Sequence, residues 1–341
     1  MHLTEKKINK LFFYWILLTL ILVFSIIIVG GLTRLTNSGL SITEWELLKG
    51  IFPPLNKYSW QIYFNEYKKI PQYQLLNFDM NLDQFKVIFY WEYFHRILAR
   101  LIGIFFLVPL IYFYFSKKIN YQHIKFCFVI LFLIIFQGII GWYMVLSGLT
   151  QDVTVSHYRL SIHLTTAILI ISMLFWLIRS ISSHRYRAFF IFSKKNLPFQ
   201  ILILLIFIQI IIGAFVSGLD AGKIYQTWPL MGNNYIPDDL SFKKLVNIFD
   251  LDNHSLVHFY HRNFAYFIIL YVIFISIYIF KNKISFLYKP LQILLFFLFL
   301  QVILGIYTLI SGLNIYLASL HQITSVLLIF SALNLYFLRV N

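Results

Sequence analysis

The stretch FQGIIGWYMVLSGL (residues 136–149) recurs later in the chain as LQVILGIYTLISGL (300–313). Each copy ends an apolar run of about 20 residues, the length that an α-helix needs to cross a bilayer. Similar pairs occur around this repeat in the same order: YFHR (93–96) with FYHR (259–262), and SIHLTTAILI (161–170) with SLHQITSVLLI (319–329). Self-similarity of this kind predicts a duplicated membrane protein.

The composition agrees with this prediction. Of the 341 residues, 60% are hydrophobic and 12% are charged, and the charged fraction is about half of that in soluble proteins. We predict an all-α integral membrane protein with eight transmembrane helices. They are expected near residues 11–31, 87–115, 126–147, 159–179, 199–219, 257–280, 291–311 and 319–338.

The repeat assigns four of these helices to each half of the chain. The N-terminal half, residues 1–190, includes a long outer loop at 32–86, and the C-terminal half, residues 191–341, includes an outer loop at 220–256. Four crossings return the chain to the side on which it started. The two four-helix bundles should therefore be related by a pseudo-two-fold axis along the membrane normal.

The distribution of basic residues predicts the orientation. Lys and Arg occur at both termini and in the short segments after the second, fourth and sixth spans, but not in the short loops at 148–157 and 312–318. By the positive-inside rule both termini are cytoplasmic and the long loops face outward. The first apolar run is too long for a signal-peptide core and should be a retained span. No transit segment precedes it, which favours the inner membrane of a bacterium.

Ten histidines are present, and five fall in predicted termini or loops: His2, His123, His157, His184 and His254. Of the five in predicted spans, four occupy equivalent positions of the second, fourth, sixth and eighth spans: His95, His163, His261 and His321. A histidine in a membrane span is costly and is by default a candidate functional residue. One such residue could be a core imidazole that is hydrogen-bonded to a carbonyl group. That explanation is poor for four histidines at matched positions, each a few residues inside the outward end of its helix.

Two imidazoles on facing helices, present twice, fit bis-histidine haem ligation in the core of a helix bundle. Zinc more often takes three or four ligands of mixed type. Propionates at the outward end would require cationic partners. The candidates for that role, which could also reach the lipid headgroups, are Arg96, Arg100, Arg159 and Arg262.

The two halves differ at one acidic position. Glu92 precedes His95 by three residues and should lie on nearly the same helix face, whereas the matching residue of the second half is His258. A carboxylate beside one haem could move protons, or it could simply pair with Arg96. His258 is an alternative to His261 as a ligand, although the repeat favours His261.

The chain resembles haem A synthases of the alphaproteobacterial and mitochondrial branch. The motifs that carry the resemblance span nearly the whole chain: GGLTRLTNSGLSITEW (30–45), GIFPP (50–54), EYFHRILAR (92–100), HLTTA (163–167), AGKIYQTWPLMGNNYIP (221–237), HFYHR (258–262) and HQITS (321–325). Some bacterial members carry a cysteine pair in the outer loops. The single cysteine here, Cys127, lies in an apolar run, which excludes such a dithiol.

The resemblance implies an oxidoreductase that converts a methyl group of haem O to the formyl group of haem A, for terminal oxidases, by successive hydroxylation. The formyl oxygen would come from water or from dioxygen. The substrate haem O is implied between His95 and His163, a resident haem b between His261 and His321, and a catalytic role for Glu92. Expected partners are a haem O synthase as substrate donor, an electron donor or acceptor and the bilayer. A homo-oligomer is compatible with the sequence, whereas the scattered basic residues do not favour nucleic acid.

Two other classes of protein compete with this interpretation. A di-haem b-type membrane cytochrome that only transfers electrons explains the four histidines equally well, but it does not explain an acid in one half only. A transporter would explain the repeat, but the spans lack paired Gly or Pro breaks near their middles.

Overall fold

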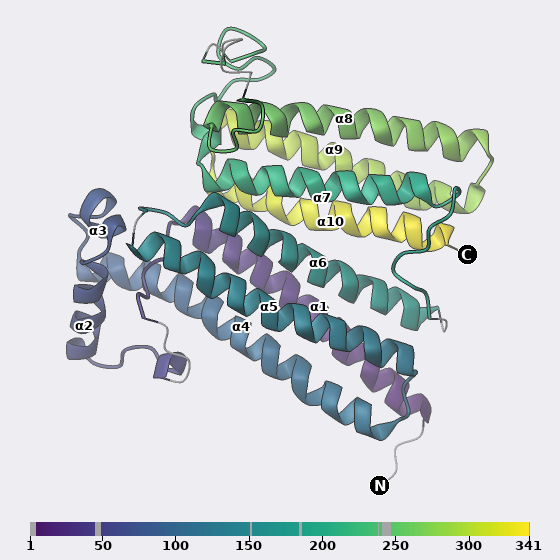
Figure 1. The fold of residues 1–341 in the computed structure, drawn as a ribbon, viewed down its shortest axis with the longest axis horizontal. Helices are drawn as coiled ribbons and strands as arrows, with labels where there is room; N and C mark the ends of the chain where they lie inside the picture. Colours follow the sequence, from purple (N-terminus) through teal and green to yellow (C-terminus); the bar gives the residue numbers. More distant parts are fainter. Residues whose placement is uncertain are drawn as a thin grey trace. The chain divides into compact units, whose positions relative to one another are not determined.

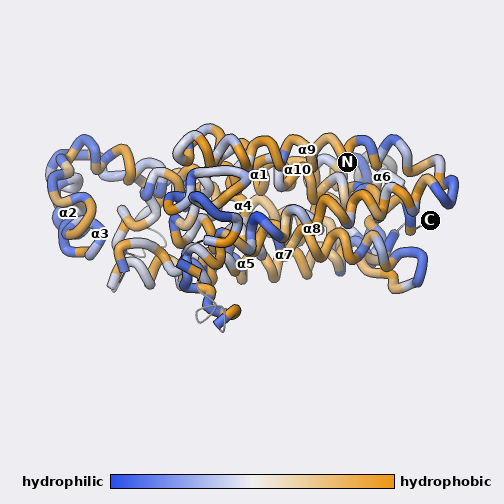
Figure 2. The backbone as a smooth tube through the Cα atoms, turned by 90° about the horizontal axis from the view of Figure 1, so that it is seen from above, coloured by the Kyte–Doolittle hydropathy of each residue, from blue (hydrophilic) through white to orange (hydrophobic). Residues whose placement is uncertain are grey.

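The computed structural model describes residues 5–44, 49–150, 152–183, 186–237, 239–240 and 247–340. Among these, eight helices are long and apolar enough to cross a membrane, so the predicted all-α membrane fold is confirmed (Figure 1). They are α1 (Glu5–Leu35), α4 (Leu82–Ser116), α5 (Tyr121–Thr150), α6 (His157–Ser182), α7 (Leu197–Gly218), α8 (His254–Lys281), α9 (Tyr288–Ile310) and α10 (Ile315–Arg339). Hydrophobic residues dominate these helices along their length (Figure 2).

The chain forms two compact units, residues 1–187 and 188–341. In the first, α1 and α5 each pack against both α4 and α6, which closes a four-helix bundle. In the second, α7 and α9 each pack against both α8 and α10. Each helix of the second unit therefore has the same neighbours as its counterpart in the first. The two-fold relation between the units stays a prediction.

The first unit has helical structure outside its bundle that the apolar runs did not predict. Two short helices, α2 (Lys57–Tyr67) and α3 (Pro71–Leu76), lie in the first outer loop. The helix α4 begins at Leu82, where Asn81 and Gln84 form a reciprocal capping box, so it starts five residues before the predicted span. Residues 45–48 of the same loop, at and just after the end of the motif at 30–45, lie outside the described residues.

The extended start of α4 packs against α2 through a buried aromatic cluster. Its members, from both helices, are Trp60, Phe64, Tyr67, Phe85 and Phe89. The rings of Trp60 and Phe89 meet edge to face at 4.9 Å between centroids, a favoured arrangement of aromatic pairs. This cluster holds α2 on the same helix that carries Glu92 and His95.

Tyr67 joins this cluster to a polar network, and its replacement by phenylalanine should destabilise the outer loop. The buried hydroxyl donates to Gln72 Oε1 at 3.0 Å and accepts from Asn77 Nδ2 at 2.7 Å. Burial raises the pKa of Tyr67 to about 12, so the phenol stays protonated at neutral pH and keeps donating. We expect Tyr67→Phe to cost about 1–3 kcal/mol because it leaves two partners unsatisfied. Thermal unfolding and faster proteolysis within 57–80 would measure this, and an unchanged profile would contradict it.

Candidate functional site

Each of the four histidines lies against a glycine on the preceding helix of its bundle. In every pair, a Cβ atom added to the glycine would lie within about 3 Å of the imidazole Cε1, closer than nearly all real Cβ contacts. The pairs are His95 with Gly30 (2.9 Å), His163 with Gly141 (3.1 Å), His261 with Gly213 (3.0 Å) and His321 with Gly305 (2.9 Å). The same contact thus occurs four times, and it fixes each ring against the neighbouring backbone.

In the second unit, the two histidine rings face each other across the bundle. The centroids of His261 and His321 are 6.5 Å apart, and the ring planes are inclined by 77°. Imidazole nitrogens bind a metal at about 2 Å, which places the centroids of two rings on one metal roughly 6 Å apart. The spacing therefore fits two axial ligands of a haem iron. The choice between His261 and His258 as the partner of His321 stays a prediction.

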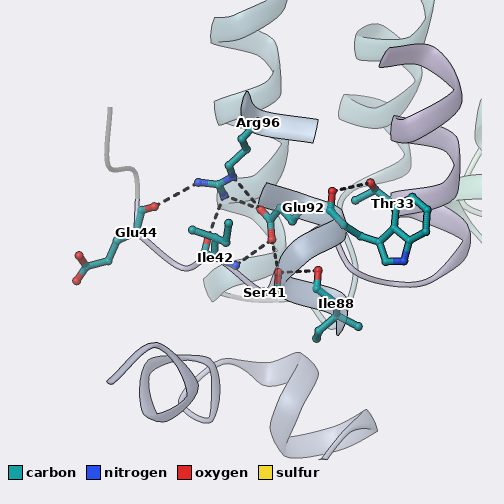
Figure 3. A network of polar contacts seen from close by, with 8 residues as sticks. Thr33, Ser41, Ile42, Glu44, Ile88, Glu92 and Arg96 are labelled. Carbon is teal, nitrogen blue, oxygen red and sulfur yellow. Dashed lines mark hydrogen bonds and ion pairs between the residues drawn. The ribbon is translucent and has the colours of Figure 1, made fainter. Parts of the chain in front are cut away.

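Glu92 lies at the centre of a polar network that joins α4 to the first outer loop (Figure 3). Glu92 is 3% exposed. One carboxylate oxygen, Oε2, accepts from Ser41 Oγ at 2.7 Å and from the Ile42 backbone N–H at 2.9 Å. The other, Oε1, accepts from Arg96 Nη2 at 2.6 Å and Nε at 3.1 Å. Four donors thus hold this carboxylate one helical turn from His95.

The four candidate propionate arginines donate to backbone carbonyl groups. The guanidinium of Arg96 reaches the carbonyl oxygens of Ile42 and Glu44 as well as Glu92. The other contacts are Arg100 to Gly50 O (3.1 Å), Arg159 to Tyr143 O (2.7 Å), and Arg262 to Thr227 O, Pro229 O and Leu230 O (2.7–3.2 Å). Arg96 and Arg100 therefore connect the first outer loop to the part of α4 that carries His95. Arg262 connects the second outer loop to the part of α8 that carries His261.

The placement of three other histidines differs from the sequence prediction. His123, His157 and His254 lie in the first turn of α5, α6 and α8 rather than in loops, because these helices begin two to five residues earlier than their apolar runs. His123 Nε2 lies 3.2 Å from Ser180 Oγ. His95 also lies deeper in its helix than predicted, 13 residues after the first residue of α4, Leu82. The other three candidate ligands lie six or seven residues after the first residue of their helices.

Sequence reasoning did not identify Ser41, the four glycines or the glutamines near the histidines. Gly141 and Gly305 occupy equivalent positions of the repeated stretch at 136–149 and 300–313, and so do Gln137 and Gln301. This equivalence between the two copies of the repeat is the sequence signal that could have identified these glycines and glutamines. Ser41 had only its place in the motif at 30–45, which does not predict its contact with Glu92, because that contact joins residues 51 positions apart.

The fold and this site define a duplicated eight-helix membrane protein with a histidine pair in each bundle and an acid in only one. The family model described as cytochrome oxidase assembly protein matches residues 13–333. A haem A synthase of Pelagibacter ubique is 47% identical over 324 residues, covering 93% of each chain. Those of Flavobacterium johnsoniae and Rickettsia felis are 40% and 38% identical, over 95% of this chain and 96% of each relative. The chain belongs to this family of haem A synthases and cytochrome oxidase assembly proteins, as the resemblance predicted.

Proposed function

We propose that this protein is a haem A synthase, which oxidises a methyl group of haem O to the formyl group of haem A. His95 and His163 of the first bundle would hold the substrate haem O, and His261 and His321 of the second would hold a resident haem b. The observation that carries the proposal is the fourfold histidine–glycine contact combined with a buried acid at one of the four sites.

The residues present fit this pair of haems. The spacing of the His261 and His321 rings would let both imidazoles bind one haem iron, and apolar helices would supply the surroundings that a porphyrin requires. The bound haem b would supply an electron-transfer centre. Arg100, Arg159 and Arg262 would be propionate partners, because the backbone carbonyls that they bind are neutral acceptors that a carboxylate would outcompete. Arg96, which already pairs with the carboxylate of Glu92, is the fourth candidate.

The reaction removes four electrons from the methyl carbon and adds one oxygen atom. Written with water as the oxygen source, R–CH3 + H2O gives R–CHO + 4 H⁺ + 4 e⁻, and two successive hydroxylations lead to a geminal diol that loses water. Glu92 stabilises positive charge that develops near the reacting carbon or accepts one of these protons. Arg96, Ser41 and the Ile42 N–H hold its carboxylate in place. A di-haem cytochrome that only transfers electrons does not require a buried acid beside the histidines of one bundle and none beside those of the other.

The same proposal includes the membrane location, the orientation and the partners of the protein. The protein is a multi-pass component of a bacterial inner membrane with both termini in the cytoplasm and both haem sites toward the outer side. A haem O synthase delivers the substrate, and a separate redox partner exchanges the electrons. The short basic segments on one side of the spans support this orientation.

Four histidine variants test the two haem assignments. In cells that also make haem O, the wild-type protein should yield haem A on extraction and chromatography. His261→Ala and His321→Ala should remove the haem b absorbance of the purified protein, whereas His95→Ala and His163→Ala should keep it and form no haem A. If the first pair kept its haem b, or the second pair still formed normal haem A, the assignment of the two halves would be wrong.

A further inference from the structure

The repeat places a histidine where the first half has its buried acid. His258 on α8 corresponds to Glu92 on α4, and each precedes a candidate iron ligand by three residues. An arginine follows each of them by four residues, so Arg262 lies on the same helix face as His258, just as Arg96 lies on the face of Glu92. The two positions are therefore equivalent along the repeat, but they carry different chemical groups.

The arginine of the first bundle has a carboxylate partner within the chain. Arg96 Nη2 donates to Glu92 Oε1 at 2.6 Å, and the glutamate is buried (Figure 3). A guanidinium and a carboxylate in such contact form a strong, charge-assisted hydrogen bond. The pair thus balances both charges without any ligand.

The arginine of the second bundle has no such partner. Arg262 donates to the backbone carbonyl groups of Thr227, Pro229 and Leu230, which are neutral. No carboxylate within the described parts of the chain pairs with it. The residue one turn before it is His258, which brings no negative charge. The second bundle therefore contains a cation whose charge the chain does not balance.

His258 itself has a buried nitrogen atom without a partner. The residue is 3% exposed, and its Nδ1 forms no hydrogen bond with the residues that the structure describes. Burying a polar atom without a partner is unfavourable, so the atom indicates a group that the chain does not supply. The Nδ1 atoms of His95, His163 and His321 share this property, but those rings are proposed iron ligands, whereas His258 is not.

We propose that His258 and Arg262 together bind one propionate of the resident haem b. The proposal rests on the proposed function, which assigns that haem to His261 and His321 with its propionates toward the outward end. Because α8 begins at that end, His258 lies about 4.5 Å nearer to it than His261, at about 1.5 Å per residue. An imidazole N–H and a guanidinium suit a carboxylate. A carboxylate of the ligand thus replaces, in the second bundle, the Glu92 carboxylate of the first.

The first bundle cannot bind a propionate in the same way. Glu92 already carries the negative charge that a propionate would bring, and two carboxylates beside one arginine repel each other. The propionates of the substrate are therefore left to Arg100 and Arg159. The contact at position 258 belongs to the resident haem alone.

Three substitutions of His258 test this contact on the purified full-length protein with its haem b. His258→Leu removes the donor, His258→Gln keeps an N–H group, and His258→Glu rebuilds the ion pair of the first bundle. Excess apomyoglobin is added in detergent, and the transfer of haem b is followed by absorbance. The leucine and glutamate variants should lose haem about 10–100-fold faster than the wild type, because a hydrogen bond to a charged group is lost. The glutamine variant should lose it at close to the wild-type rate.

The same helix provides a matched control. His254→Leu makes the same change one turn earlier on α8, at an exposed position, and it should leave the rate of haem loss unchanged. A role of His258 in core packing would give the opposite order of variants, because leucine suits an apolar helix interface and glutamine does not.

Two spectroscopic readouts respond to the propionate itself. The resonance Raman band of the propionate bending vibration, which depends on hydrogen bonding, should shift in His258→Leu and stay in place in His258→Gln. The midpoint potential of haem b should fall in His258→Leu, because a propionate without its donor presents more negative charge to the iron and stabilises the ferric state.

The outcomes separate this proposal from the proposed function. If His258→Leu and His258→Glu kept the wild-type haem loss and Raman band while His261→Ala and His321→Ala lost haem b, the propionate contact would be wrong and the ligand assignment would stand. If His258→Leu removed the bis-histidine spectrum while His261→Ala kept it, His258 would be the iron ligand, and both would be overturned.

Discussion

Replacing Glu92 by alanine or glutamine is expected to stop haem A formation and to leave the haem b of the second bundle in place. The side chain is buried and accepts four hydrogen bonds one helical turn from His95. If it handles a proton or stabilises charge at the reacting carbon, its removal should lower the rate by at least about 100-fold. Glutamine keeps the shape but not the charge, so both variants should fail to the same degree.

The measurement is the ratio of haem A to haem O in extracts, together with the haem b absorbance of the purified variants. Glu66→Gln is the control, because it removes the charge of a partly exposed glutamate near the end of α2 that pairs with Lys69 at 2.7 Å, and surface pairs of this kind contribute little. Ser41→Ala should give an intermediate loss, since three of the four donors to Glu92 remain. Normal haem A formation by Glu92→Gln would contradict a role for its charge.

The membrane fold and the histidine positions could be predicted because both depend on local patterns. An apolar run of helical length predicts a span wherever it occurs, and the repeat made His95, His163, His261 and His321 equivalent without any knowledge of contacts. The acid at Glu92 stood out for the same reason, since its counterpart is His258. These features require only alignment of the chain with itself.

The helices of the outer loop and the partners of Glu92 depend on contacts between distant residues. Segments α2 and α3 are short and moderately polar. They are held by packing, α2 against α4 and α3 against α5, rather than by a long apolar run. The partners of the arginines could not be predicted from the sequence for the same reason. A charge pattern predicts that Arg96 and Arg262 require acceptors, but only the folded chain shows that loop carbonyls supply them.

Adding a single methyl group at the four histidine-facing glycines should separate the two haem sites. Gly213→Ala and Gly305→Ala place a Cβ about 3 Å from His261 or His321, the two residues proposed to hold haem b, so the ring must shift from its present position. We expect both variants to lose most of their haem b. Gly30→Ala and Gly141→Ala meet His95 and His163 in the same way, so they should retain haem b and form little haem A. Absorbance of the purified proteins and haem extraction measure these two losses separately.

The same helices provide the control that makes this test decisive. A Cβ added to Gly138 on α5 or to Gly103 on α4 meets no atom within 4 Å. Alanine favours a helix by about 1 kcal/mol over glycine, so all six substitutions should stabilise the helix locally. Gly138→Ala and Gly141→Ala lie three residues apart, and only the second should impair haem A formation. Equal activity of that pair would show that contact with the imidazole ring does not determine the chemistry at His163.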